Sequence, residues 1–136
     1  MRRYSSLGEH GMLWLAIAGV GALVHRRRRR VYLMAIRAIL LTYVANTVIK
    51  VTISRARPLL EDLPHLTPTL SGRSYPSAHA SMSFAGAHAL SRALPAPPLY
   101  AGAAAMAASR PYLGVHYPTD VLAGAVLGAA MAELTG

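Results

Sequence analysis

Three short clusters of cationic, hydroxyl and imidazole side chains carry the chemistry that this sequence could perform. They lie at residues 50–58, 76–79 and 109–120. Together they supply fixed positive charge, two histidines, and a carboxylate that could orient an imidazole. This set suits the binding of a phosphate and its cleavage without a metal ion, because Arg and Lys bind phosphate oxygens and His can act as acid, base or nucleophile. The chain has no cysteine, so a disulfide framework and a thiolate metal site are both excluded.

The first cluster contains Lys50 and Arg57, seven residues apart. This spacing is about two helical turns, so a helix that continued to Arg57 would place both cations on one face. Pro58 disfavours helical geometry at Arg57, and we expect the helix to end about there. Arginine can bind two phosphate oxygens at once, whereas lysine acts as a point charge. The alternative is a pair of cations that anchor a membrane span at its interface.

The second cluster, Pro76-Ser77-Ala78-His79, precedes an apolar stretch. Proline is favoured at the first helical position, so we expect Ser77, Ala78 and His79 in the first turn of a helix. Free N–H groups and the helix dipole favour an anion there. The hydroxyl and the imidazole could bind a phosphate and protonate a leaving oxygen. The alternative is an interfacial histidine without a chemical role.

The third cluster contains Arg110, His116 and Asp120. His116 and Asp120 are four residues apart, so the two side chains can touch if the segment is helical. An Asp bonded to one ring nitrogen fixes the tautomer and makes the other nitrogen a better base or nucleophile. The alternative is an Asp that caps a helix beside a chance histidine, but the nearby cation favours function.

Five apolar segments divide the chain, and they predict an all-α fold. They are residues 11–24, 31–53, 77–94, 99–109 and 117–134. Only the second has the roughly 20 residues that cross a bilayer comfortably. Prolines interrupt the chain after the second and third segments, and Pro95, Pro97 and Pro98 predict a tight turn. We predict one domain over residues 1–136, an integral membrane bundle of about five transmembrane helices. The alternative is a soluble, alanine-rich helical protein.

The net charge of +9 could indicate a nucleic-acid binder, but five arginines form one run, Arg26 to Arg30, between two apolar segments. This run is typical of a cytoplasmic loop, so we predict a multi-pass protein of the cell membrane and no nucleic-acid partner. Threading alternate spans from this loop places all three clusters on the opposite, extracytoplasmic face. The first segment is predicted to be an uncleaved span, since the arginines follow it and no small-residue cleavage site does.

The last apolar segment contains Gly124 and Gly128, a GxxxG pattern that allows close approach of two helices. Packing inside the same bundle is the favoured interpretation, and a homodimer through these glycines is the alternative. Four further histidines match no cluster and are interpreted as structural or interfacial: His10, His25, His65 and His88.

The three clusters, in this order, resemble the signature of the type-2 phosphatidic acid phosphatase superfamily. The matching patterns are Lys-x6-Arg-Pro, Pro-Ser-x-His and Ser-Arg-x5-His-x3-Asp, over residues 50–120. The chain departs from the family in two respects. Ala78 replaces the usual glycine, and five apolar segments stand where membrane members usually have six, so we expect an N-terminal span to be missing.

The resemblance implies a role for each matching residue. His116 would attack phosphorus and form a phosphohistidine, Asp120 would orient it, and His79 would protonate the leaving oxygen and then help to activate water. The residues implied to hold the phosphate are Lys50, Arg57, Ser77, Ala78 through its N–H, and Arg110. No cofactor and no metal are implied.

The sequence therefore predicts a membrane lipid phosphatase that cleaves a phosphate monoester or pyrophosphate. Its substrate would be a polyprenyl phosphate or pyrophosphate, phosphatidic acid or a related lipid, and membrane lipids would surround it. The leucines of residues 58–70 are expected to guide the lipid chain. The alternatives are a lipid phosphotransferase with the same phosphohistidine, a non-enzymatic basic membrane protein that binds anionic lipids, and a vanadate-binding oxidase, although such oxidases are soluble and far larger.

Overall fold

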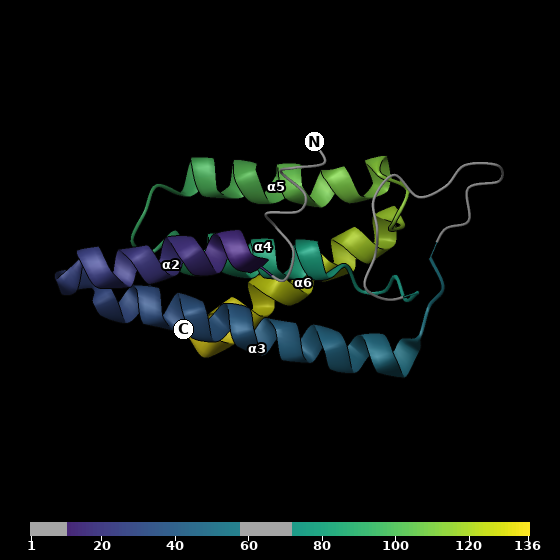
Figure 1. The fold of residues 1–136 in the computed structure, drawn as a ribbon, viewed down its shortest axis with the longest axis horizontal. Coiled ribbons are helices and arrows are strands. Elements are labelled where there is room, and N and C mark those ends of the chain that lie inside the picture. The colour runs from purple at the N-terminus through teal and green to yellow at the C-terminus, as the bar shows by residue number, and fades with distance from the viewer. Residues whose placement is uncertain (1–10, 58–71) are drawn as a thin grey trace.

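The structure is a computed structural model that describes residues 11–57 and 72–136. Within these ranges it is helical, as the sequence predicts. Its elements are α2 (Met12–Val24), the 3-10 turn η2 (Arg26–Arg28), α3 (Arg29–Ile53), α4 (Ala78–Leu90), α5 (Ala96–Tyr112) and α6 (Pro118–Thr135). Figure 1 shows them as a bundle in which successive helices run in opposite directions. The leucines predicted to guide the lipid chain, His10 and His65 lie outside the described residues.

Two helix boundaries beside the clusters differ from the predictions. Helix α3 ends at Ile53, because Ser54 adopts a left-handed conformation (φ 52°) and donates its N–H to the Lys50 carbonyl at 3.0 Å. The helix therefore does not continue to Arg57. Ser77 is the N-cap of α4, so Pro76 precedes the helix instead of starting it.

The predicted tight turn of prolines is also wrong in part. Helix α5 begins at Ala96 and contains Pro97 and Pro98 in its first turn. Proline is tolerated there because the first N–H groups of a helix have no partner within it. The fourth apolar segment is therefore longer than predicted.

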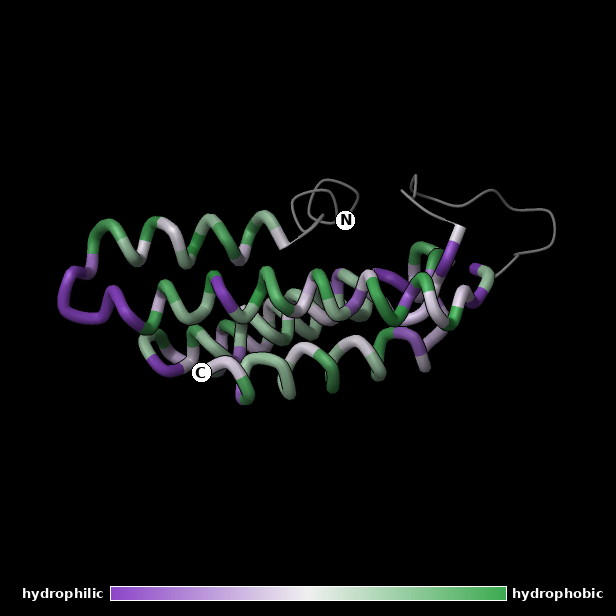
Figure 2. The backbone as a smooth tube through the Cα atoms, turned by 90° about the horizontal axis from the view of Figure 1, so that it is seen from below, coloured by the Kyte–Doolittle hydropathy of each residue, from purple (hydrophilic) through white to green (hydrophobic). Residues whose placement is uncertain are grey.

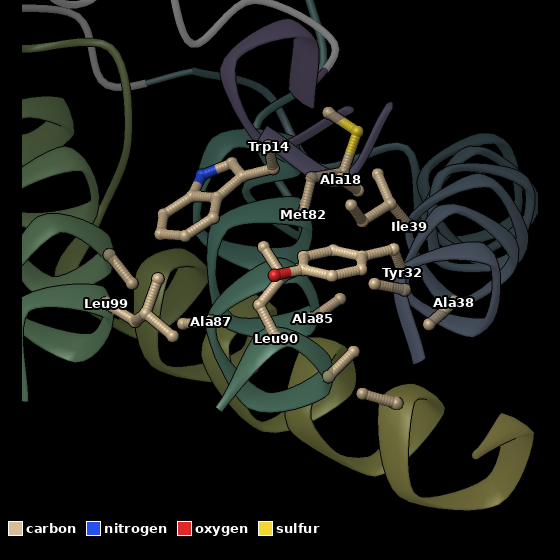
Figure 3. Packing of buried hydrophobic residues seen from close by; sticks show 14 of the residues in the cluster. Trp14, Ala18, Tyr32, Ala38, Ile39, Met82, Ala85, Ala87, Leu90 and Leu99 are labelled. Atoms are coloured by element: carbon tan, nitrogen blue, oxygen red, sulfur yellow. The ribbon is translucent and has the colours of Figure 1, made fainter. Parts of the chain in front are cut away.

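The core lies where α2, α3 and α4 meet, and small residues let these helices approach closely. Trp14, Tyr32, Ile39, Met82 and Leu90 fill the space among buried alanines (Figure 3). Close packing of small residues is typical of helices in membranes.

Buried polar groups in this core are paired across helices. The Trp14 indole donates to the Ser83 hydroxyl at 3.0 Å, and the Asn46 amide donates to the Ser81 hydroxyl at 2.8 Å. These bonds fix α4 against α2 and α3, which matters because α4 carries the second cluster at its start.

Helix α6 packs on α4 through its two glycines. A Cβ at Gly124 would press on the backbone oxygen of Ser77, and one at Gly128 would press on the backbone oxygen of Ser81. The GxxxG pattern thus packs inside the bundle, as the favoured interpretation predicted. A homodimer through the same positions stays a prediction.

The far ends of α4 and α6 are joined by a polar contact. His88 contacts the Tyr100 hydroxyl at 2.9 Å through Nδ1 and the Glu133 carboxylate at 2.8 Å through Nε2. Arg92 also donates to Glu133, at 3.2 Å. His88 therefore has the structural role that the sequence suggested.

Large apolar side chains cover the outside of the bundle. Those that are more than half exposed include Leu23, Val44, Val48, Val126 and Leu134. A water-soluble monomer seldom exposes so much apolar surface, and a lipid-facing bundle does. Among the described residues, one helical stretch, Arg26–Ile53, is long and apolar enough to span a membrane by itself, and α2 is a shorter apolar helix. Figure 2 shows the hydrophilic connection between α2 and α3 at one end of the bundle.

Candidate active site

The three clusters meet at the end of the bundle opposite the arginine run. The end of α3, the start of α4, the end of α5 and the start of α6 come together there (Figure 1). A hydrogen bond of 3.0 Å from the Ser77 N–H to the Asp120 carbonyl joins the starts of α4 and α6. The clusters therefore gather at one end of the bundle, because alternating helices return the chain to this end.

His116 lies in the connection between α5 and α6 and is almost completely buried. A guanidinium nitrogen of Arg57 lies 3.3 Å from its Nε2. Since a guanidinium can only donate, Nε2 accepts with its lone pair, and the ring proton of the neutral histidine is on Nδ1. The Nδ1 atom faces the Asp120 carboxylate, with 3.8 Å between Nδ1 and Oδ2.

The surroundings of His116 keep its ring neutral. Burial, followed by the charges of Arg57, Arg110 and Lys50, lowers the pKa of His116 from 6.5 to about 2. Burial also lowers the pKa of the Arg57 guanidinium. A neutral imidazole with a lone pair on Nε2 is the form that can act as a nucleophile.

Asp120 lies in the first turn of α6 and is fully buried. Its Oδ2 accepts from the Tyr117 N–H at 2.8 Å, and its Oδ1 accepts from Arg55 at 3.0 Å. The condition that His116 and Asp120 lie on one helix is not met, because α6 begins at Pro118. They face each other across the helix start instead, at a distance longer than a hydrogen bond.

Arg55 is a site residue that sequence reasoning missed. Besides Asp120, it donates to the Thr119 hydroxyl at 3.0 Å, and its guanidinium lies 4.2 Å from the centre of the Tyr117 ring. The alternation Arg55-x-Arg57 was the available signal. Alternate residues of an extended chain share a face, and the chain is extended here because α3 ends at Ile53.

A short antiparallel contact orients the two arginines. Ala56 and Arg73 form an isolated bridge, with hydrogen bonds from the Arg57 N–H to the Gly72 carbonyl (3.3 Å) and from the Ser74 N–H to the Arg55 carbonyl (2.8 Å). Arg57 then donates to the Val115 carbonyl at 2.6 Å, beside His116. The bridge therefore brings Arg57 to the candidate site, as a helix continued to Arg57 would have done.

The remaining predicted residues surround His116 from three helices. Lys50 is in the last turn of α3 and Arg110, almost completely buried, is in the last turn of α5. Ser77 caps α4 by accepting from the Ala80 N–H at 3.4 Å. Ala78 and His79 are the first two residues of that helix, so their N–H groups point out of the helix start.

This arrangement can hold an anion against a neutral nucleophilic imidazole. Three cations and a helix start carry the positive charge, and Asp120 lies behind the imidazole. Among the residues that the structure describes, no three His, Asp or Glu side chains come together to hold a metal ion. Metal independence stays a prediction.

A helical bundle with an apolar exterior and a cation-lined histidine site defines a membrane phosphatase. Comparison with known proteins shows the family to which the chain belongs. The family model of the PAP2 superfamily matches residues 31–135, which is most of the chain. The chain therefore belongs to this superfamily.

Curated relatives agree with this assignment. The chain is 42% identical over 125 residues to the decaprenylphosphoryl-5-phosphoribose phosphatase of Mycolicibacterium smegmatis, covering 90% of this chain and 68% of that protein. It is 30% identical over 128 residues to the undecaprenyl-diphosphatase of Sulfolobus acidocaldarius, covering 90% of this chain and 62% of that protein.

Two solved structures share the fold. Aquifex aeolicus LpxE superposes with a TM-score of 0.82 at 27% identity, covering 98% of this chain and 81% of that one. The transmembrane PAP2-type phosphatidylglycerolphosphate phosphatase of Bacillus subtilis gives a TM-score of 0.75 at 28% identity, covering 97% and 71%.

Proposed function

We propose that this protein is a lipid phosphatase that hydrolyses a phosphate monoester or diphosphate carried by a polyprenyl lipid, through a phosphohistidine on His116. The similarity to a decaprenylphosphoryl-5-phosphoribose phosphatase and an undecaprenyl-diphosphatase supports this substrate class. The observation that carries the mechanism is the neutral imidazole of His116. Its Nε2 lies 3.3 Å from the guanidinium of Arg57, a group that binds phosphate well, and its Nδ1 faces Asp120.

In the first step, Nε2 of His116 attacks phosphorus and the bond from phosphorus to the leaving oxygen breaks. His79 donates a proton to that oxygen. Lys50, Arg57 and Arg110 offset the charge on the phosphoryl oxygens, and Ser77 with the N–H of Ala78 completes the binding site. Asp120 stabilises the imidazole as it gains positive charge.

In the second step, water attacks the phosphohistidine. His79, now without its proton, removes a proton from the water, and the bond between Nε2 and phosphorus breaks to release inorganic phosphate. In this scheme the cationic side chains stabilise the negative charge on the phosphoryl group and His79 carries out both proton transfers. The proposed reaction therefore needs no metal ion.

In the membrane, we propose that five helices of a single domain cross the bilayer, with the site end on the extracytoplasmic face. The exposed apolar side chains along the helices support the crossing, and the arginine run at the opposite end supports the orientation. This arrangement would bring the site to the interface, where the phosphate of a lipid lies.

The test is phosphate release from undecaprenyl diphosphate by the purified chain in detergent. His116→Ala is expected to lower kcat by on the order of 10⁴-fold or more, as for a lost nucleophile. His79→Ala is expected to cost about 10²–10⁴-fold, as for a lost general acid. His25→Ala is the control, because His25 is exposed near the other end of the bundle and should leave the rate unchanged.

Two results would contradict the proposal. Full activity of the His116→Ala variant would exclude the phosphohistidine. A reversible loss of activity on adding a chelator would show that the reaction depends on a metal ion.

A further inference from the structure

An apolar groove of about 440 Å³ opens beside α2 at the end of the bundle that carries the arginine run. Its lining includes Ala16, Val20 and Val24 of α2, Tyr32 of α3, and Leu94 between α4 and α5. The wall on α2 extends for about 12 Å from Ala16 to Val24 at the rise of a helix. Val20 and Val24 are 61% and 67% exposed, so this wall is open to the outside of the bundle.

The floor of the groove is a tightly packed pair, Gly21 and Tyr32. Tyr32 is 2% exposed, and a Cβ at Gly21 would collide with its ring. A larger residue at position 21 would push the ring away and overpack the contact. The groove is therefore fixed by the way in which α2 packs on α3.

Two arginines lie where the groove meets the polar end of the bundle. The Arg28 guanidinium donates to the Ala93 carbonyl at 2.8 Å, and Ala93 directly precedes Leu94. Arg29 lies three residues before Tyr32 on α3, so these two residues are on the same side of the helix. An anion at this end of the groove would have both guanidinium groups beside it.

The arginine run carries positive charge that the described part of the chain does not neutralise. None of its five arginines forms an ion pair with a described Asp or Glu, and the sequence has no acidic residue between Glu9 and Glu61. A signal for membrane orientation requires only that such charges lie near the membrane. It does not account for an arginine that is bonded to the connection between α4 and α5 beside an apolar groove.

We propose that this groove binds an anionic glycerophospholipid, with its phosphate on Arg28 and Arg29 and one acyl chain along α2. Guanidinium groups bind phosphate oxygens strongly, and basic pockets between membrane helices suit anionic headgroups. The lipid would come from the cytoplasmic leaflet, since the arginine run lies on that side in the proposed orientation. The site does not depend on the phosphatase activity, because it lies at the end of the bundle opposite His116.

The headgroup supplies the affinity, and the groove determines where the lipid binds. Lipid tails around the protein are as apolar as the groove, so the acyl chain gains no hydrophobic free energy when it enters. The bound lipid would connect α2, through the groove, to the connection between α4 and α5, through Arg28. Because a ligand that binds only the folded state stabilises it, the lipid should raise the thermal unfolding midpoint.

The test measures this midpoint for the full-length protein in nanodiscs of phosphatidylcholine that contain increasing fractions of phosphatidylglycerol. The anionic lipid should raise the wild-type midpoint by roughly 5 °C. Arg29→Gln should raise the fraction needed for half of this shift about fivefold, which corresponds to about 1 kcal/mol for one arginine. Arg30→Gln is the matched control, because Arg30 lies two residues before Tyr32, on the other side of α3. It should change this fraction less than about twofold.

A second pair of variants tests the groove itself. Ala16→Phe places a ring in the groove and should reduce the shift to less than about 1 °C. Ala104→Phe should keep the full shift, because Ala104 is exposed on α5 and does not line the groove. Each variant is compared with itself in phosphatidylcholine alone, so a change in its own stability does not affect the comparison. Should Ala16→Phe fail to fold, the smaller change Ala16→Leu is measured in its place.

Two results would overturn this site. One is the absence of a shift in the wild type. The other is an equal effect of Arg29→Gln and Arg30→Gln with the shift retained in Ala16→Phe, since the anionic surface would then act on the charge of the whole run. A wild-type protein that shows the shift and the expected variant effects but releases no phosphate from any lipid would support the site and contradict only the proposed function.

Discussion

The carboxylate of Asp120 is shared between the backbone of Tyr117 and the side chain of Arg55, and it faces His116 at a longer distance. Arg55 therefore fixes the direction of the Asp120 carboxylate, although Arg55 contacts Asp120 and not His116. This makes Arg55 a positioning residue.

Replacement of Arg55 tests this role. Arg55→Gln should lower kcat about tenfold with KM almost unchanged, since the orientation of His116 changes while the phosphate-binding cations remain. Arg55→Lys should restore part of the loss, because an ammonium can still pair with Oδ1. The measurement is steady-state kinetics with farnesyl diphosphate. Arg26→Gln, which removes an exposed arginine at the opposite end, should have no effect, and a rise in KM as large as the fall in kcat would mean that Arg55 binds the substrate.

The sequence predicts which residues gather at the candidate site, and it does not predict their local geometry. The spacing of the three clusters identified Lys50, Arg57 and His116 without any knowledge of the fold. The helical spacing of these residues does not apply in the structure, since Ser54 ends α3 before Arg57 and His116 precedes α6. Helix ends depend on a single residue's conformation, and hydropathy does not report it.

At the scale of elements, the contact between α4 and α6 connects packing to chemistry. Gly124 lies against Ser77, the N-cap that starts the second cluster, and Gly128 lies against Ser81 one turn further on. Any side chain at these two positions would push α6 away from α4. The start of α6 carries Asp120, so the same movement would separate the second and third clusters.

Gly128→Val is expected to destabilise the protein by about 1–3 kcal/mol, as overpacking usually does. The measurement is the thermal unfolding midpoint in detergent. Gly19→Val is the matched control, because a Cβ at Gly19 has no atom within 4 Å, and it introduces the same β-branched residue into a helix. Equal midpoints for the two variants would contradict the packing role. Loss of self-association with an unchanged midpoint would instead identify a dimer interface.

The order and number of helices in the described residues followed from hydropathy, and the boundaries did not. The predicted segment, residues 99–109, is shorter than α5 because the prolines before it were taken to form a turn. Pro97 and Pro98 instead lie in the first turn of α5, where the backbone needs no N–H donors.

The whole molecule has two chemically different ends. One carries the arginine run and the other carries the site, and apolar side chains lie between them. This polarity predicts a fixed orientation in the membrane, since arginines on the cytoplasmic side resist translocation.

The orientation can be measured directly because the chain contains no cysteine. In intact cells, a membrane-impermeant thiol reagent should label the Gly72→Cys variant and should not label the Arg27→Cys variant until the membrane is permeabilised. Both positions are exposed in the structure, so access through the protein does not limit the reaction. Labelling of the Arg27→Cys variant alone would show that the orientation is the opposite one. Equal labelling of both variants in intact cells would contradict a bundle that spans the membrane.

The Arg57 guanidinium lies 3.3 Å from Nε2 of His116, the atom that we propose attacks phosphorus. An N–H donor on this lone pair lowers its nucleophilicity, so the proposed attack requires Arg57 to move off Nε2. An incoming phosphate offers the guanidinium stronger, charged acceptors. The anion would thus draw Arg57 away from Nε2 of His116 as phosphorus approaches that nitrogen. Binding of the substrate would itself make the histidine reactive.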